Sequence, residues 1–161
     1  MNARVPVYDT GMLIALADRK AKAVRLHEGM KATPHRAIVP GPVLGQVWRP
    51  TPSTVHALAT ALWDCTIPHA RSSPGALRPT AAGQPVCLLC STALDLTEWH
   101  RVGGALGTAD LPPKKRPDVV DALVAITAVR HGSAVVFTSD PDDISAYLSA
   151  LNAQDVRLVA V

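Results

Sequence analysis

The sequence is poor in aromatic residues and in cysteine. Phenylalanine, tryptophan and tyrosine make up 4% of its 161 residues, so base stacking on aromatic side chains is not expected to be its main mode of recognition. Its three cysteines are too few, and odd in number, for the paired framework of a small secreted domain. The cysteine content therefore excludes a disulfide scaffold and is typical of a reducing compartment.

Long apolar runs are also absent. No stretch approaches the roughly 18 consecutive apolar residues of a membrane span. The first residues, MNARVPVYDTG, lack the apolar segment of a secretory signal. We therefore expect a cytoplasmic protein without a membrane anchor.

The chain has no large excess of either charge. Its formal net charge is +3 and its isoelectric point is near 9.0, a mild basicity that suits a polyanionic partner without requiring one. Hydrophobic residues account for 48% of the sequence. A chain of this length and composition predicts a single globular domain over residues 1–161, with enough apolar surface for a real core.

Strand-like and helix-like segments alternate along the chain. Strands are expected at 4–8, 36–39, 65–67, 134–137 and 156–161, and helices at 12–17, 21–32, 42–48, 55–63, 95–107, 118–132 and 141–151. The apolar run 86–90 is a further strand candidate that competes with 65–67 for one place in the sheet. The segment 69–85 is rich in proline, glycine, serine and alanine. This composition is typical of loops, and we interpret residues 70–93 as a loop insertion. This alternation predicts an α/β fold with a central parallel sheet and helices on both sides.

The segment DVVDALVAITAVRHG, residues 118–132, has the clearest helical signature. Pro117 suits a first helical turn, Asp118 and Asp121 lie where the helix dipole favours negative charge, and Gly132 can adopt the left-handed conformation that ends a helix. The residues between them leave almost no polar face, so we expect this helix to be covered on most sides.

Aspartates follow two of the expected strands. Asp9 comes after the first strand and Asp140 after the strand 134–137, and open parallel sheets bind ligands at the carboxyl ends of their strands. Asp118 and Asp121 at the mouth of the long helix can join them there. Carboxylates gathered without matching cations repel one another, and hard oxygen ligands suit Mg²⁺ or Mn²⁺. Such an ion can activate water and polarise a phosphoryl oxygen, which is the chemistry of phosphodiester hydrolysis.

Small hydroxyl residues and a basic loop accompany these acids. Thr10 and Thr138 could orient water or ligand oxygens, whereas Ser139 is more simply explained as a turn residue. The run Lys114, Lys115 and Arg116 directly precedes Asp118. It is a candidate for contacting RNA phosphates, with a solvated loop as the alternative.

Four segments in this order resemble the PIN domain, and in particular the VapC-type toxin ribonucleases. They are VYDTG at 7–11, VPGPVLGQVWR at 39–49, DVVDALVAITAVRHG at 118–132 and AVVFTSDPDD at 134–143. The resemblance implies a three-layer α/β/α fold and a Mg²⁺ or Mn²⁺ site of three or four acids that cleaves RNA. It also implies a toxin of a type II toxin–antitoxin system, a cognate antitoxin as a partner, and a homodimer.

The resemblance assigns roles to residues by motif. The first acid is Asp9, the third is Asp121 and the fourth is Asp140, with Asp118 as a further metal ligand and Asp142 or Asp143 as accessory acids. The family usually has glutamate at the second position, where this chain has Gln46, which removes one negative charge from the site. Arg49, three residues later, is expected on the same helical side and could reach a phosphate.

Some features of the sequence are compatible with other functions. Gln46 and the insertion favour a second hypothesis, a catalytically weak or inactive PIN-fold binding or regulatory protein. An aspartic protease is rejected because the Asp-Thr-Gly triplet has no second copy, and a haloacid dehalogenase phosphatase because position 11 is not aspartate. Cys87 and Cys90 could form half of a zinc site, completed by Cys65, His69 or His100, but one such pair within an apolar run is more typical of a buried strand.

Overall fold

The protein is an α/β structure organised around a sheet of five parallel strands. The computed structural model describes residues 4–49, 51–68 and 88–161. The strands are β1 (Val5–Tyr8), β2 (Ala37–Ile38), β3 (Cys65–Thr66), β4 (Ser133–Thr138) and β5 (Asp155–Ala160), and their order in the sheet is β3-β2-β1-β4-β5. The predicted α/β fold with a central parallel sheet is confirmed.

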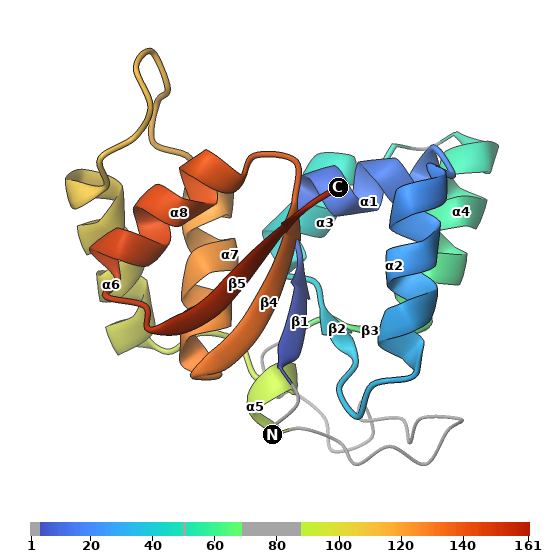
Figure 1. Ribbon diagram of the computed structural model, residues 1–161, viewed down its shortest axis with the longest axis horizontal. Coiled ribbons are helices and arrows are strands. Elements are labelled where there is room, and N and C mark those ends of the chain that lie inside the picture. The colour runs from blue at the N-terminus through green and yellow to red at the C-terminus, as the bar shows by residue number, and fades with distance from the viewer. Residues whose placement is uncertain (1–3, 50, 69–87) are drawn as a thin grey trace.

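Helices cover both faces of this sheet. They are α1 (Thr10–Ala17), α2 (Ala21–Lys31), α3 (Gly41–Val47), α4 (Pro52–Leu62), α5 (Leu88–Ser91), α6 (Leu96–Thr108), α7 (Val119–Arg130) and α8 (Pro141–Ala150). Figure 1 shows α6, α7 and α8 on one side of the sheet and α1, α2 and α4 on the other, which gives three layers. Within the described part of the chain, none of these helices is long and apolar enough to cross a membrane.

Helix α7 is covered on most sides, as the sequence predicted. All eight residues from Val120 to Ala128 other than Asp121 are buried. Asp118 caps its amino end, where the Oδ1 atom accepts a hydrogen bond of 2.7 Å from the amide of Val120, and Gly132 follows its end with a φ of 71°. Pro117 precedes the capping residue, so its expected place in the first turn was wrong.

The chain changes direction within the sheet between β1 and β4. From β1 it moves outward through β2 to β3, and it later returns to pair β4 with the opposite edge of β1, with Tyr8 beside Phe137. Ligands of open parallel sheets bind outside the carboxyl ends of the strands at such a switch point. Asp9 directly follows β1, and Asp140 follows β4 after one intervening residue.

One expectation for the region between β3 and α6 needs correction. The run 86–90 was considered as a strand, but residues Leu88–Ser91 form the short helix α5, and β3 takes the place at the edge of the sheet. A short apolar run has the same pattern in a buried strand and a buried helix. Most of the predicted insertion at 70–93, including Cys87, lies outside the described residues.

Candidate functional site

One cavity at the switch point is lined by five aspartates from three separate segments. Its volume is about 350 Å³, and it is lined by Asp9, Thr10, Gly11, Ile14, Gln46, Lys115, Arg116, Asp118, Asp121, Ser139, Asp140 and Asp143. The segments are the β1–α1 junction, the start of α7 with its preceding loop, and the β4–α8 junction, with Gln46 added from α3. The three acids that the sequence predicted to converge, Asp9, Asp121 and Asp140, therefore border the same space.

Asp9 is held rigidly between the two central strands. Its Oδ2 atom accepts a hydrogen bond of 2.7 Å from the Thr138 hydroxyl, and its Oδ1 atom accepts one from the amide of Thr10 at the start of α1. The residue is 4% exposed. Burial raises the pKa of this carboxyl, the hydrogen bonds from Thr138 and the backbone oppose that rise, and the charge of Asp140 adds to it.

Asp121 is the acid whose ionisation is most perturbed. Burial in the first turn of α7 raises its pKa to about 7, and repulsion from Asp9, Asp118, Asp143 and Asp140 contributes to the same shift. The carboxyl is therefore close to half protonated at neutral pH. Burial and the surrounding carboxylates thus both disfavour the ionised form of Asp121.

Gln46 reaches the cavity from α3 and is bonded to its wall. The Thr10 hydroxyl donates a hydrogen bond of 2.6 Å to the Gln46 Oε1 atom. This bond joins the first residue of α1 to α3 at the edge of the cavity. The hydrogen bond from Thr10 involves only the carbonyl oxygen of the Gln46 side-chain amide. The Gln46 side chain thus keeps the acceptor that a glutamate would offer, without the charge.

Asp140 and Asp143 share one cation. The Lys115 Nζ atom lies 2.7 Å from Asp143 Oδ2 and 3.5 Å from Asp140 Oδ1. The Asp143 side chain is 10% exposed and that of Asp140 is 59% exposed. The sequence treated Asp143 only as one of two possible accessory acids, and Lys115 only as a contact for RNA.

Three residues proposed from the sequence lie elsewhere. Asp142 lines a different cavity, together with Thr108 and Asp110. Helix α3 ends at Val47, so Arg49 does not share a helical face with Gln46 as expected, and its Nη1 atom donates instead to the carbonyl of Trp48. Lys114 is exposed and is not among the residues that line the aspartate cavity.

Gly11 is a feature of the site that the sequence analysis did not single out. A β-carbon at this position would lie 2.6 Å from the Ser139 Cβ atom and 2.8 Å from its backbone nitrogen, closer than packed atoms approach. Only glycine lets the first turn of α1 lie against the β4–α8 junction. Its place directly after Asp9 and Thr10 was the available signal.

The donor set of the cavity fits a hard divalent cation by its chemistry. Carboxylate oxygens are the ligands that Mg²⁺ and Mn²⁺ prefer, and five carboxylates face the two cationic side chains of Lys115 and Arg116. Within the described residues, no three His, Cys, Asp or Glu side chains already form a metal-ligand group. Because Mg²⁺ keeps several of its waters and needs only one or two carboxylates, a preformed cage of protein ligands is not required.

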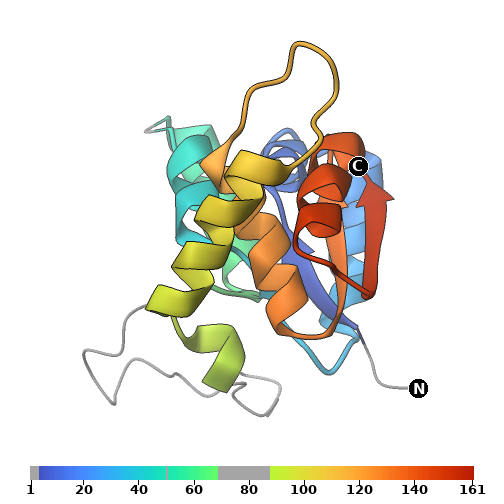
Figure 2. The same cartoon turned by 90° about the vertical axis from the view of Figure 1, so that its left-hand side faces the viewer.

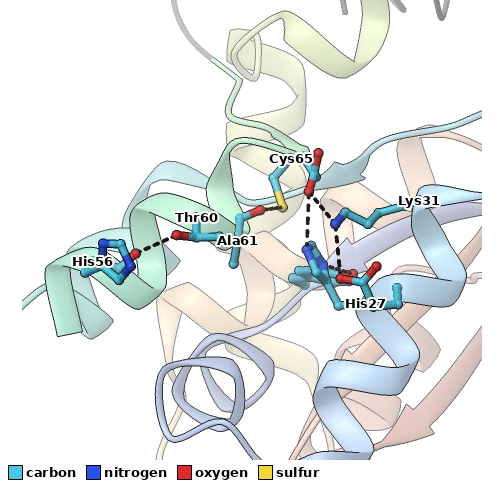
Figure 3. Close-up of polar contacts among 9 residues, drawn as sticks. His27, Lys31, His56, Thr60, Ala61 and Cys65 are labelled. Carbon is cyan, nitrogen blue, oxygen red and sulfur yellow. Dashed lines mark hydrogen bonds and ion pairs between the residues drawn. The ribbon is translucent and has the colours of Figure 1, made fainter. Parts of the chain in front are cut away.

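A second polar cluster lies away from this cavity and has a structural role. The Tyr8 hydroxyl lies 3.0 Å from His27 Nδ1, and His27 Nε2 lies 3.8 Å from Asp64 Oδ2. Lys31 pairs with the same Asp64 at 3.2 Å and with Glu28 at 3.0 Å; Figure 3 shows these contacts around His27 and Lys31. Burial lowers the pKa of His27, which keeps the ring neutral at pH 7. The cluster therefore links β1, α2 and the turn before β3.

Replacing Tyr8 with phenylalanine is expected to destabilise the fold without touching the aspartate cavity. The substitution leaves the buried His27 Nδ1 atom without its partner, which costs about 1–2 kcal/mol. Urea unfolding of the wild type and of Tyr8→Phe measures this difference. The control is a double-mutant cycle with His27→Leu and Tyr8→Phe/His27→Leu. Removing both partners should cost less than the sum of the two single substitutions. Strict additivity would show that the contact does not contribute.

Comparison with models of known protein families found no match to this chain, and neither the curated proteins nor the solved structures gave one. Its function is therefore inferred from the geometry and chemistry of the aspartate cavity, together with the resemblance of its motifs.

Proposed function

We propose that this protein is a divalent-metal-dependent endoribonuclease of the PIN type. The single observation that carries the proposal is the convergence of Asp9, Asp121 and Asp140 on one cavity at the switch point of a parallel sheet. These three residues come from three separate motifs, and the family resemblance assigns the metal to them together with Asp118, which lines the same cavity. The position of these acids in one cavity supports the proposal, although Asp143 lines the cavity as well.

The surroundings of each acid suit a distinct task. Asp9 is fixed by hydrogen bonds to both of its oxygens and would be the most rigid ligand of a cation. Asp121 would bind it in its ionised form, and Asp140, at the exposed rim, would complete the set. Mg²⁺ or Mn²⁺ bound by these oxygens supplies an activated water and stabilises charge on the phosphate. Arg116, which also borders the cavity, can pair with a phosphate of the RNA.

The cellular role follows from the resemblance alone and is part of the proposal. A PIN ribonuclease of the VapC type would act in the cytoplasm as the toxin of a type II toxin–antitoxin pair. Its partners would then be an RNA substrate, a cognate antitoxin that holds it inactive, and a second copy of the chain.

The experiment that tests the proposed function measures metal binding and cleavage together. Calorimetry with Mn²⁺ is carried out on the wild type and on Asp121→Asn, and both proteins are incubated with a mixed RNA pool with and without Mn²⁺. We expect the wild type to bind the ion and to cleave RNA only in its presence. The variant should lose at least about 100-fold in cleavage, because one of few charged ligands is gone. A wild type that binds no Mn²⁺ would exclude a metal-dependent nuclease.

A second candidate function is favoured by Gln46. The missing charge at this position and the satisfied hydrogen bond from Thr10 are compatible with a PIN-fold protein that binds RNA or a regulatory partner without efficient cleavage. Both candidates share the fold and the cavity. They differ in whether the negative charge left at the site is enough for catalysis.

Gln46→Glu separates the two candidates. The Thr10 hydroxyl can donate to a glutamate oxygen as it does to Gln46, so the new charge enters without loss of the existing contact. We expect Mn²⁺ affinity to rise about 5- to 10-fold, measured by calorimetry, because one carboxylate is added to the set. Gln46→Met is the control that removes the amide without adding charge. If the wild type cleaves RNA at a rate close to that of Gln46→Glu, the non-catalytic candidate is excluded.

A further inference from the structure

Lys115 occupies a special position among the basic residues near the aspartate cavity. Its ammonium group lies 2.7 Å from Asp143 Oδ2 and 3.5 Å from Asp140 Oδ1, whereas its neighbour Lys114 does not line the cavity. The side chain is 47% exposed, so its charged end reaches into the site from solvent. A cation supplied by the protein itself thus lies against two of the five carboxylates.

The loop between α6 and α7 presents Lys115 in a defined way. The amide of Lys115 donates a hydrogen bond of 3.0 Å to the carbonyl of Pro112, which closes a turn over Pro113 and Lys114. Lys114 has a φ of 74°, the value that a type II turn requires at its third residue. Figures 1 and 2 show this segment rising as a loop beyond the ends of α6 and α7. The loop is attached to the α8 end of the site through the Lys115 contacts.

Asp143 explains why such a cation is needed. The residue is 7% exposed and lies in the first turn of α8, where the helix dipole offsets only part of the cost of burying a carboxylate. The other carboxylates of the cavity add electrostatic repulsion to this cost. The Lys115 ammonium group, 2.7 Å from Asp143 Oδ2, offsets both effects.

We propose that Lys115 is the internal counter-cation of the aspartate cavity, and that a divalent cation entering the cavity displaces it from Asp140 and Asp143. This inference rests on the proposed function, because it assumes that the cavity binds Mg²⁺ or Mn²⁺. Two cations of total charge +3 cannot share the same carboxylates as closely as one can. Lys115 is the cation that can leave, since its side chain is 47% exposed and its single charge attracts the carboxylates less than the two charges of the metal ion.

Displacement would couple the metal to the loop. While Lys115 is paired, the loop over residues 112–117 is tied to α8, and once the pair is broken the lysine is free at the rim of the cavity. Without metal, the Lys115 ammonium group would reduce the net negative charge of the cavity. With metal bound, the protein would expose a basic loop instead.

Lysine acetylation read by mass spectrometry tests this directly. Brief treatment with an N-hydroxysuccinimide ester of acetate is followed at Lys115 and, as the internal reference, at Lys114. In the presence of a chelator, Lys115 should react several times more slowly than Lys114. Saturating Mn²⁺ should raise the rate at Lys115 at least about threefold and leave Lys114 unchanged. Asp143→Asn without metal should raise it to a similar extent.

The outcomes distinguish failure of this inference from failure of the proposed function, because calorimetry on the same samples reports Mn²⁺ binding. Binding without a change at Lys115 overturns the inference and leaves the nuclease proposal standing. A faster reaction at Lys115 in a protein that binds Mn²⁺ but cleaves no RNA supports the inference and contradicts the nuclease. Absence of Mn²⁺ binding overturns both.

A substitution of Lys115 gives a second, independent measurement. Lys115→Met keeps a flexible chain of similar length and removes the charge, so Mn²⁺ no longer competes with an ammonium group. We expect its Mn²⁺ affinity to rise about 3- to 10-fold over that of the wild type, with Lys114→Met unchanged as the matched control. Equal affinities of Lys115→Met and the wild type would overturn the proposal even if Asp143→Asn fails to fold.

Discussion

Replacing Asp121 with asparagine is expected to make the metal-free protein more stable at pH 8, although under the proposed function the same change lowers cleavage. In the folded protein, burial and four neighbouring aspartates raise the pKa of Asp121 from 3.8 to about 7. Above pH 7 the native state therefore holds an ionised group that its surroundings disfavour. Asparagine has nearly the same shape and no charge to bury.

The pH dependence of this effect has a definite sign. The unfolded chain releases the Asp121 proton near pH 4, whereas the folded protein keeps it until about pH 7. The folded state thus binds more protons between these values, and its stability falls as the pH rises across them. The advantage of Asp121→Asn should be absent near pH 4, grow up to about pH 7 and then remain constant.

The magnitude follows from the size of the shift and from partial solvent exposure. The full shift corresponds to about 4 kcal/mol, and screening of this partly exposed side chain reduces the expected gain to about 2 kcal/mol. Loss of a favourable charge in the first turn of α7 subtracts about 0.5 kcal/mol. In a chain of this length the remainder raises the melting temperature by about 5 °C.

Thermal unfolding of the wild type and of Asp121→Asn, with a chelator and with Mn²⁺, measures their relative stability in the metal-free and metal-bound states. A ligand at 100 times its dissociation constant stabilises the folded state by about 2.7 kcal/mol, so Mn²⁺ should make the wild type the more stable protein. Asp110→Asn, at an exposed position outside the cavity, serves as the control and should change stability by less than about 0.5 kcal/mol. If Asp121→Asn is less stable than the wild type at pH 8 without metal, burial and the neighbouring aspartates do not raise the pKa of Asp121 in the folded protein.

Gly11→Ala is expected to disrupt the site more than any substitution that leaves its acids intact. The added β-carbon meets the backbone nitrogen of Ser139 at 2.8 Å, and backbone cannot move aside as a flexible side chain can. Either α1 or the β4–α8 junction must shift, at a cost of about 1–3 kcal/mol. Because Asp9 precedes α1 and Asp140 follows Ser139, the shift separates two of the proposed ligands. Mn²⁺ affinity and cleavage should fall at least about tenfold.

Gly104→Ala is the matched control for this substitution. Gly104 lies within α6, and a β-carbon there has no atom within 4 Å. Alanine is favoured over glycine inside a helix by about 0.5–1 kcal/mol, so this variant should be slightly stabilised and keep its metal affinity. Urea unfolding and Mn²⁺ calorimetry on both variants give the comparison. A Gly11→Ala protein with the stability and affinity of the wild type would show that the contact of α1 with Ser139 is dispensable.

Several elements were predictable because their signals are local. The apolar run that follows Asp118 and ends at Gly132 identifies α7. For α6, Asp95 and Glu98 are three residues apart and form a capping box at the start of the helix. Alternation of strands and helices predicted the parallel sheet. That sheet in turn predicts that residues directly after β1 and β4 meet at one edge.

Short elements without such signals were less predictable. The run 86–90 is apolar throughout and has no period that separates a strand from a helix, so α5 was mistaken for a strand candidate. Arg49 was placed on the helix of Gln46, but the backbone of Trp48 is extended and ends α3 first.

The sequence by itself determined the order of the elements, the parallel sheet and the three segments that carry the acids, because hydrophobic period, capping residues and turn residues act over a few neighbours. Only the tertiary structure decided which of Asp142 and Asp143 borders the cavity, since adjacent residues on a helix point in different directions and the packing of α8 sets its rotation. It also paired Lys115 with Asp143, 28 residues away, and placed Gly11 against Ser139. Contacts of this kind depend on how whole elements pack, and no local pattern encodes them.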